Sequence, residues 1–268
     1  MEAKEQLIQR WDSFLLKMKQ RYLESLDQAK EACLSQLEET DYDYYTVMRS
    51  WGGMVAQVQL LIPKIDETWE EKVEPQMEAL NSSDYFYLDE GKKTSELTDE
   101  LHMIMMRFHK TLEGELSQKY YNHVMEVSTK NFNCSQCSAP ITIQKNVFRA
   151  QYLTCQSCNS VNTFEPDTKF MQIGGTIIDN IVALKCVPLK DEMEKIYDEI
   201  HQLRRENHTD EVWAAYKTAY FMYWETFFKE RILLKSDTEE RYEADMERKK
   251  VEFVEFENTQ RHNKYGEA

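Results

Sequence analysis

The sequence reads CSQC at residues 134–137 and, after a spacer of seventeen residues, CQSC at residues 155–158. Two cysteines separated by two residues can bind one ion from a single tight turn, and two such turns supply four thiolates. Four thiolates in a tetrahedral arrangement are a ligand set that Zn²⁺ prefers. The sequence therefore predicts one zinc ion per chain, with the ligands Cys134, Cys137, Cys155 and Cys158.

The predicted zinc ion has a structural role, because four cysteinates fill its coordination sphere and leave no position for water or substrate. An iron–sulfur cluster could use the same ligands, and the local spacing does not exclude it. A disulfide framework would indicate secretion, but the N-terminus is polar and has no apolar signal-peptide stretch. A thioredoxin-like dithiol needs a strand–helix–strand pattern beside one pair, which this sequence lacks.

The residues around the two cysteine pairs resemble a zinc ribbon. Runs suited to short strands occur at residues 141–144, 147–154 and 161–164. The resemblance covers residues 131–166 and implies a small β module built around the metal. Many ribbons carry glycine directly after the second cysteine of each pair, where a positive φ turns backbone amides toward the sulfurs. This chain has Ser138 and Asn159 there, and serine adopts that conformation less readily than asparagine.

The rest of the sequence is typical of long helices. Only seven glycines and five prolines occur in 268 residues, and 41% of the residues are apolar. Apolar side chains recur every three or four positions within residues 3–38, 41–61, 66–80, 95–125, 170–184, 191–205 and 209–232. A loop is predicted at residues 81–93, and the pairs Gly52-Gly53 and Gly174-Gly175 are expected to allow close packing. The predicted fold class is mainly α, a bundle of long amphipathic helices with a small inserted β zinc ribbon.

The predicted organisation has four parts. They are an N-terminal helical part at 1–130, the zinc ribbon at 131–166, helices at 167–236 that pack on the N-terminal part, and a charged helical tail at 237–268. A capping-box pattern at residues 236–239 predicts that a helix continues or restarts there. Further along the tail, Val251, Phe253, Val254 and Phe256 lie close together among charged residues. They are either an anchor for a partner, placing a partner surface at residues 239–268, or a segment that folds back onto the bundle.

Charge and hydropathy limit the classes of partner. The net charge of −15 disfavours phosphate backbones, and the ribbon carries only Lys145 and Arg149 against Glu165. Nucleic acid is therefore an unlikely partner, and the ribbon aromatics are expected to pack inside more often than to stack on bases. The longest apolar stretch, at 177–184, is short and interrupted, so we expect no membrane span and a cytoplasmic protein.

A search for catalytic motifs finds neither a phosphate-binding loop, nor a serine-nucleophile elbow, nor a metalloprotease helix. Asp198 and His201 have the spacing of half a di-iron motif, but no second copy exists. His102 and His109 are two helical turns apart, too distant to share an ion without other ligands. The sequence therefore predicts no catalytic residue, no organic cofactor and no enzymatic activity.

Three hypotheses about function follow from these patterns. The favoured one is a non-enzymatic scaffold or adaptor that binds another protein, or a second copy of itself, through helical surfaces. The second is a factor that contacts nucleic acid through the ribbon within a larger assembly. The third is an enzyme whose site is assembled from scattered residues that no local motif reveals.

Overall fold

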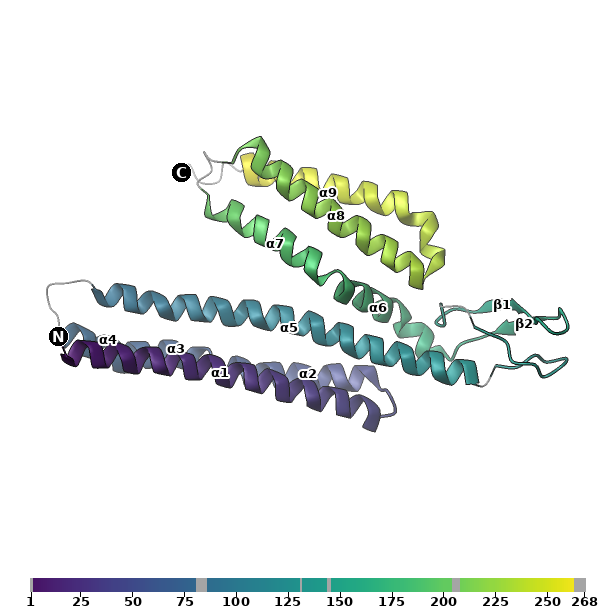
Figure 1. Cartoon of the computed structure of the whole chain (residues 1–268), viewed down its shortest axis with the longest axis horizontal. Helices are drawn as coiled ribbons and strands as arrows, with labels where there is room; N and C mark the ends of the chain where they lie inside the picture. Colours follow the sequence, from purple (N-terminus) through teal and green to yellow (C-terminus); the bar gives the residue numbers. More distant parts are fainter. Residues whose placement is uncertain (1, 81–85, 131, 144–145, 204–207, 263–268) are drawn as a thin grey trace. The chain divides into compact units, whose positions relative to one another are not determined.

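The protein is built mainly from helices (Figure 1). The computed structural model describes residues 2–80, 86–130, 132–143, 146–203 and 208–262. The helices are α1 (Glu2–Glu39), α2 (Tyr44–Gln59), α3 (Pro63–Thr68), α4 (Glu74–Leu80), α5 (Phe86–Lys130), α6 (Thr168–Lys185), α7 (Val187–Gln202), α8 (Asp210–Leu234) and α9 (Tyr242–His262). A π-helical turn, η1 (Trp69–Val73), and a 3-10 turn, η3 (Ser236–Arg241), adjoin them. The strands β1 (Gln151–Thr154) and β2 (Val161–Phe164) pair between α5 and α6, which confirms the predicted fold class.

The chain divides into two compact units, residues 1–112 and residues 113–268. The division falls within α5, so this helix contributes its first part to one unit and its second part to the other. The division into parts at residues 130, 166 and 236 stays a prediction.

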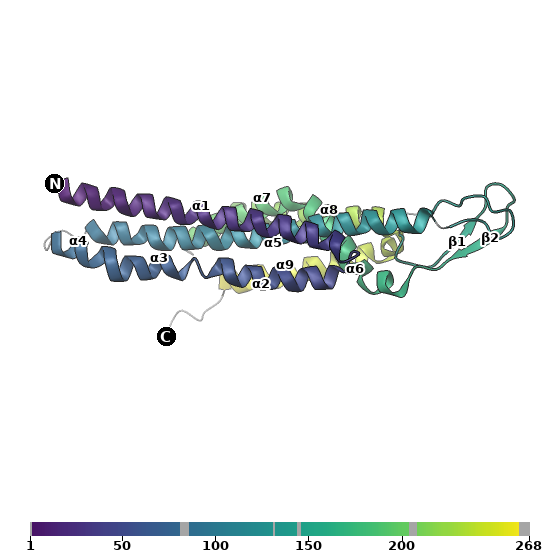
Figure 2. The same ribbon diagram turned by 90° about the horizontal axis from the view of Figure 1, so that it is seen from below.

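In the first unit, α1 lies beside α2, α4 and the first part of α5 (Figures 1 and 2). Two ion pairs join α1 to α5: Lys19 to Glu100 at 2.5 Å, and Asp12 to Lys93 at 2.8 Å. The predicted apolar stripe of α1 faces the interior, and its buried members are Leu7, Trp11, Met18, Tyr22, Leu26, Ala29, Cys33 and Leu37. The helical periodicity therefore identifies the buried face of α1 correctly.

Two predictions that involve glycines are wrong in this unit. The predicted loop at 81–93 is wrong from Phe86 onward, because α5 begins there; residues 81–85 lie outside the described ranges. Gly91 is a packing residue within this helix, since a Cβ atom on it would lie 2.9 Å from the Trp69 ring. The prediction for Gly52-Gly53 is also wrong, because, apart from the backbone of α2 itself, no atom of the described residues lies within 4 Å of a Cβ built on either glycine.

The segment predicted as one helix at 66–80 begins at Pro63 and contains the π turn η1. Pro75 has no backbone N–H and its ring crowds the carbonyl group one turn earlier, which disfavours an uninterrupted α-helix at this point. The backbone N–H of Glu74 donates to the Trp69 carbonyl oxygen instead. The interruption therefore coincides with a residue that cannot complete the regular hydrogen-bond pattern.

In the second unit, α6 packs closely at two glycines. A Cβ atom on Gly114 of α5 would lie 2.5 Å from the Leu184 Cβ, and one on Gly174 would lie 2.4 Å from the Phe148 Cβ. Gly175 differs from its neighbour, because no atom in the described part of the chain, apart from the backbone of α6 itself, lies within 4 Å of its Cβ position. The expected close packing is thus confirmed for Gly174 and wrong for Gly175. The Gly174 notch receives the Phe148 ring and so fixes the ribbon segment against α6.

The helices α7, α8 and α9 enclose an aromatic core. Its buried members are Ile200, Trp213, Tyr216 and Phe253, and its partly buried neighbours are Met193, Ile196, Tyr197, Val212, Tyr220, Phe221 and Phe256. Tyr216 lies 5.9 Å from Phe253 and 6.0 Å from Phe256, measured between ring centroids. The described part of the tail therefore folds back onto α8, which is the second of the two predicted alternatives.

The junction before this tail departs from the capping-box prediction. Residues 236–241 form the 3-10 turn η3, and no side chain caps its first residue. The α-helix starts only at Tyr242. Asp237 instead contacts the ribbon segment, where it accepts from Asn146 Nδ2 at 3.1 Å and pairs with Arg149 at 2.7 Å.

None of the described helices is both long enough and apolar enough to cross a membrane on its own. The adjacent helices α6 and α7, which meet at a bend of 67°, reach that length and composition only when taken together.

Substitution of the two neighbouring glycines of α6 should have opposite effects on stability. We expect Gly174→Ala to destabilise the protein by about 1–3 kcal/mol, because the new methyl group collides with Phe148. Gly175→Ala should stabilise it by about 0.5–1 kcal/mol, because alanine favours the helix and the added carbon meets open space. Melting temperatures measure both effects, and equal shifts for the two variants would contradict the packing described here.

Two neighbouring residues of α9 provide a second comparison. Phe253 is 1% exposed whereas Val254 is 52% exposed. Phe253→Ala should therefore lower the free energy of unfolding by about 3–5 kcal/mol, since it leaves a cavity in the aromatic core. Val254→Ala should change it by less than about 0.5 kcal/mol. Chemical denaturation measures both values, and a stable Phe253→Ala variant would show that α9 does not contribute to the core.

Candidate metal centre

Four cysteines lie together at one end of the hairpin formed by β1 and β2. The Sγ atoms of Cys134, Cys137, Cys155 and Cys158 all lie within 4.8 Å of one another. Two of the separations are 3.5 Å, between Cys134 and Cys158, and 3.6 Å, between Cys137 and Cys155. Zinc–sulfur bonds of about 2.3 Å in tetrahedral geometry place neighbouring sulfurs roughly 3.8 Å apart. The predicted ligands are therefore brought together with spacings that fit one ion.

Each cysteine pair lies on a tight turn, and the two turns repeat the same backbone hydrogen bonds. In the first, the N–H of Cys134 donates to the Ala139 carbonyl at 2.8 Å, and the N–H of Ser138 donates to the Cys134 carbonyl at 2.9 Å. In the second, the corresponding bonds join Cys155 to Ser160 and Asn159 to Cys155, both at 2.9 Å. The geometry of the metal site is thus built twice from the same local fold.

The residues that replace the usual glycines adopt the required conformation. Ser138 and Asn159 both have a φ of 58°, in the left-handed region. Within the same turns, backbone amides are directed at the sulfur of the first cysteine: Gln136 N lies 3.4 Å from Cys134 Sγ, and Ser157 N lies 3.4 Å from Cys155 Sγ. The departure from the usual ribbon pattern therefore does not prevent either turn from forming.

The strands are shorter than the sequence predicts. Pairing runs from Gln151 opposite Phe164 to Thr154 opposite Val161, so the third predicted strand is confirmed and the second is reduced to its last four residues. Residues 147–150 do not extend it, because Val147 is buried and Phe148 occupies the Gly174 notch. The strand predicted at 141–144 is wrong for residues 141–143, which form no strand; an isolated bridge between Asn133 and Pro140 lies just before them, and Gln144 lies outside the described residues.

The two cysteines of each pair differ in burial. Cys134 and Cys155 are 3% and 0% exposed, whereas Cys137 and Cys158 are exposed. The first cysteine of each turn therefore faces the interior of the ribbon, and the second faces solvent.

Two polar side chains add hydrogen bonds to the sulfurs. Ser160 Oγ lies 3.1 Å from both Cys134 Sγ and Cys158 Sγ, and Asn162 Nδ2 lies 3.7 Å from Cys134 Sγ. The Ser160 hydroxyl lowers the pKa of the Cys134 thiol to about 5, and it also lowers the pKa of Cys158. The backbone N–H of Ala139 lowers the pKa of Cys137, but the surrounding sulfurs of Cys158 and Cys155 outweigh it and raise that pKa to about 12.

Ser160 and Asn162 are functional candidates that no sequence motif identifies, although the sequence contains a signal for them. When the two turns are superposed by position, Ser160 corresponds to Ala139 and Asn162 corresponds to Ile141. Polar residues at these places in only one of two otherwise similar turns indicate a role beyond the backbone geometry. Asn162 is buried, and its Oδ1 accepts from the N–H and the hydroxyl of Ser135 at 2.9 and 3.0 Å.

The histidines considered for catalysis have structural contacts. His109 Nδ1 accepts from Trp51 Nε1 at 2.6 Å, and the His201 ring packs against Tyr197 with centroids 4.3 Å apart. Within the described ranges, no group of three or more cysteine, histidine or acidic side chains besides the four cysteines is close enough to share an ion. His102 and His109 therefore have no further ligands, among the described residues, with which they could share an ion.

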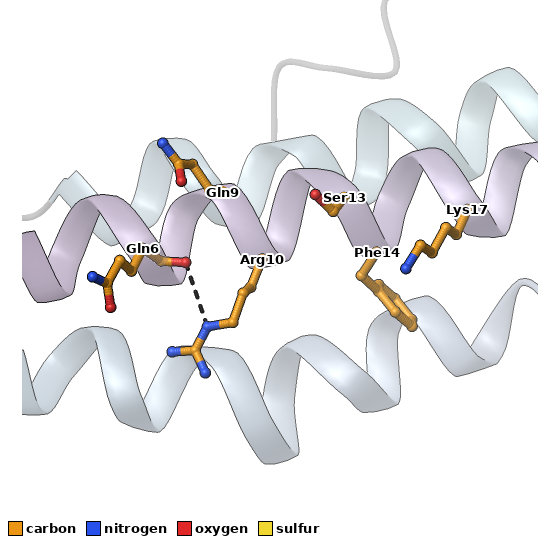
Figure 3. A pocket seen from close by; sticks show the side chains of 6 residues that line it. All are labelled: Gln6, Gln9, Arg10, Ser13, Phe14 and Lys17. Atoms are coloured by element: carbon orange, nitrogen blue, oxygen red, sulfur yellow. Dashed lines mark hydrogen bonds between the residues drawn. The ribbon is translucent and has the colours of Figure 1, made fainter.

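A shallow groove runs along one side of α1 in the first unit (Figure 3). The residues lining it are Gln6, Gln9, Arg10, Ser13, Phe14 and Lys17, all from the same helix. Arg10 Nε donates to the Gln6 carbonyl oxygen at 3.4 Å, and the groove is open to solvent. No nucleophile with an adjacent base lines it, so it lacks the converging groups of an active site.

Comparison of the chain with protein families, curated proteins and solved structures gives no match. The function is therefore inferred from the geometry and chemistry of the metal centre.

Proposed function

We propose that this chain is a non-enzymatic helical adaptor whose ribbon is held by one structural Zn²⁺ ion and contacts another protein. The convergence of four cysteine sulfurs within 4.8 Å carries the proposal. Zinc bound by four thiolates has no open position, so it would stabilise the ribbon without polarising a substrate or activating a water molecule.

The sulfur spacing favours one ion over an iron–sulfur cluster. A cluster distributes its cysteine ligands over two or more iron atoms, which separates the thiolates further than a shared ion does. Sulfur pairs at 3.5 and 3.6 Å instead support a single metal. A single iron atom could occupy the same ligands, and metal analysis distinguishes it from zinc.

The partner surface that we propose is the outward face of the strands, defined by Tyr152, Thr154, Val161 and Thr163 and called the ribbon face below. Tyr152 is 82% exposed and Val161 is 65% exposed, while the alternate residues Leu153 and Asn162 point inward. Apart from the two ligand cysteines, the exposed residues of both turns, at positions 135, 136, 138, 156, 157 and 159, have uncharged side chains in a chain that is 30% charged overall. Charge depletion around an exposed tyrosine is typical of the centre of a protein interface. We therefore infer a partner whose contacting surface is itself poor in charge.

The structure favours the ribbon face over the tail as the partner surface. The tail cluster lies on two sides of α9: Phe253 and Phe256 pack into the aromatic core, whereas Val251 and Val254 remain exposed. The aromatic members, which would contribute most to an anchor, are already used within the chain.

Nucleic acid is the second candidate partner, and the exposure of Tyr152 is the observation that favours it, since bases stack on exposed aromatic rings. The charge argues against it. Arg149 is the cation of the described ribbon residues and is paired with Asp237, while Lys145 lies outside the described ranges. The ribbon therefore offers little positive charge to neutralise the phosphates of a nucleic acid, so few counterions would be released on binding.

Metal analysis tests the zinc assignment. We expect about one equivalent of zinc per chain after purification without added metal. Cys155→Ser should lose the zinc and loosen the ribbon, while the helical circular dichroism signal changes little because the helices have their own core. Cys33→Ser is the matched control, since Cys33 is buried in α1 and should leave zinc content unchanged. Iron with visible absorbance, or a substoichiometric metal content, would contradict the assignment.

A ribbon-face variant tests the adaptor function. A protein that copurifies with the chain is first identified and purified. Tyr152→Ala combined with Val161→Thr should preserve zinc content and melting temperature but weaken binding of that protein at least about tenfold. Tyr45→Ala, which removes another exposed tyrosine from α2, should leave the same affinity unchanged. If the pure chain self-associates and the double variant abolishes this self-association, the partner is a second copy of the chain. Submicromolar binding to random DNA, lost in Tyr152→Ala, would favour the nucleic-acid hypothesis instead.

A further inference from the structure

The four sulfurs differ in the side chains that surround them. Backbone amides approach the sulfurs in both turns, but Ser160 and Asn162 add their hydroxyl and amide groups to one half of the site. The Ser160 hydroxyl lies equally far from Cys134 and Cys158 and shares its single proton between them, and the Asn162 amide reaches Cys134. Among the described residues, no side-chain N–H or O–H group lies within hydrogen-bond distance of Cys137 or Cys155.

The four cysteines also differ in burial. Cys134 and Cys155 are inaccessible to a reagent in solvent, whereas Cys137 and Cys158 are exposed. Cys158 is exposed but lies against the Ser160 hydroxyl at 3.1 Å. Cys137 is thus the ligand that combines exposure with the lack of a side-chain donor in the described structure.

Hydrogen bonds to the sulfurs matter because the loaded site is strongly negative. One Zn²⁺ and four thiolates carry a net charge of −2, and donors that withdraw electron density from a thiolate stabilise that charge and reduce its nucleophilicity. The Asn162 amide is well suited to this role, because Ser135 holds its Oδ1 from the other turn and fixes the orientation of Nδ2. Asn162, which follows the second cysteine turn, therefore joins that turn to the first.

We propose that Ser160 and Asn162 are positioning residues that make the zinc centre chemically two-sided, with Cys137 as the ligand at which electrophiles and competing chelators open it. This inference rests on the proposed zinc binding and adds the ligand that controls how the metal is lost. Cys134 and Cys158 form the protected side, and attack on Cys137 removes one bond to the ion while the others still hold it.

Limited alkylation of the zinc-loaded full chain tests the inference. The metal is counted first, and the protein is then treated with a small excess of iodoacetamide, which transfers its carboxamidomethyl group to sulfur and releases iodide. Mass spectrometry of peptides locates the label. We expect Cys137 to be labelled first and Cys158 to be labelled several times more slowly, although both are exposed.

Variants of Ser160 separate the hydrogen bond from exposure. In Ser160→Ala, Cys158 should become as reactive as Cys137, and zinc transfer to a chromogenic chelator should be about tenfold faster. Ser160→Thr keeps the hydroxyl and should keep the original labelling order. Ser157→Ala is the matched control from the same turn, because the contact of Ser157 with Cys155 Sγ uses its backbone N–H, which alanine retains.

Two results would overturn the inference while leaving the zinc assignment intact. They are equal labelling of Cys137 and Cys158 in the unmodified sequence with one zinc bound, and a Ser160→Ala variant that behaves like Ser157→Ala. A chain that contains no metal would overturn the zinc assignment and this inference together, and the metal count made before labelling identifies that result.

Discussion

The ribbon depends on four sulfur atoms that must lie within 4.8 Å of one another. Its strands have four residues each, and a two-stranded hairpin of that size is at best marginally stable in water. Four ionised thiolates at such distances repel one another, so the arrangement needs either protons or a cation. One divalent cation would bind all four thiolates at once and reduce their mutual repulsion. It would link the folding of the ribbon to the binding of the metal, because the unfolded segment holds no preformed site.

The ribbon is not a separate appendage on the second unit. The Phe148 ring fills the notch at Gly174 of α6 and meets the Tyr121 ring of α5 with centroids 5.9 Å apart. On another side, Asp237 of η3 binds the ribbon segment through Arg149. A metal bound in the ribbon would therefore be coupled to α6 by the Phe148 contact and to η3 by the Arg149–Asp237 ion pair and the hydrogen bond from Asn146 to Asp237. The apolar contact is the stronger constraint, since the Arg149 side chain is mostly exposed and its pair is weakened by water.

The sequence predicts the parts of this molecule that follow from local periodicity or from ligand spacing. The buried stripe of α1, β2, and the meeting of the four cysteines are of this kind. It fails where a residue's role depends on a distant partner. Gly91 reads as a loop residue because the Trp69 ring that it accommodates is not visible in the local sequence. Ser160 and Asn162 are ordinary strand-end residues until the fold brings Cys134 beside them.

The tail shows the same limit at a finer scale. Phe253 and Phe256 are three residues apart, as are Val251 and Val254, and in a helix each such pair shares a face. Read as a sequence, the four form one apolar cluster, whereas in α9 they are two faces, one buried against Tyr216 and the other exposed.

The strands of the ribbon follow a different rule, because alternate residues point in opposite directions. Leu153 is buried and Tyr152 is exposed for that reason, so the hairpin holds the Tyr152 ring on its outer face. The closed turns bring the residues of the ribbon face side by side, and in the proposed function this is how a structural metal would be linked to the binding of a partner.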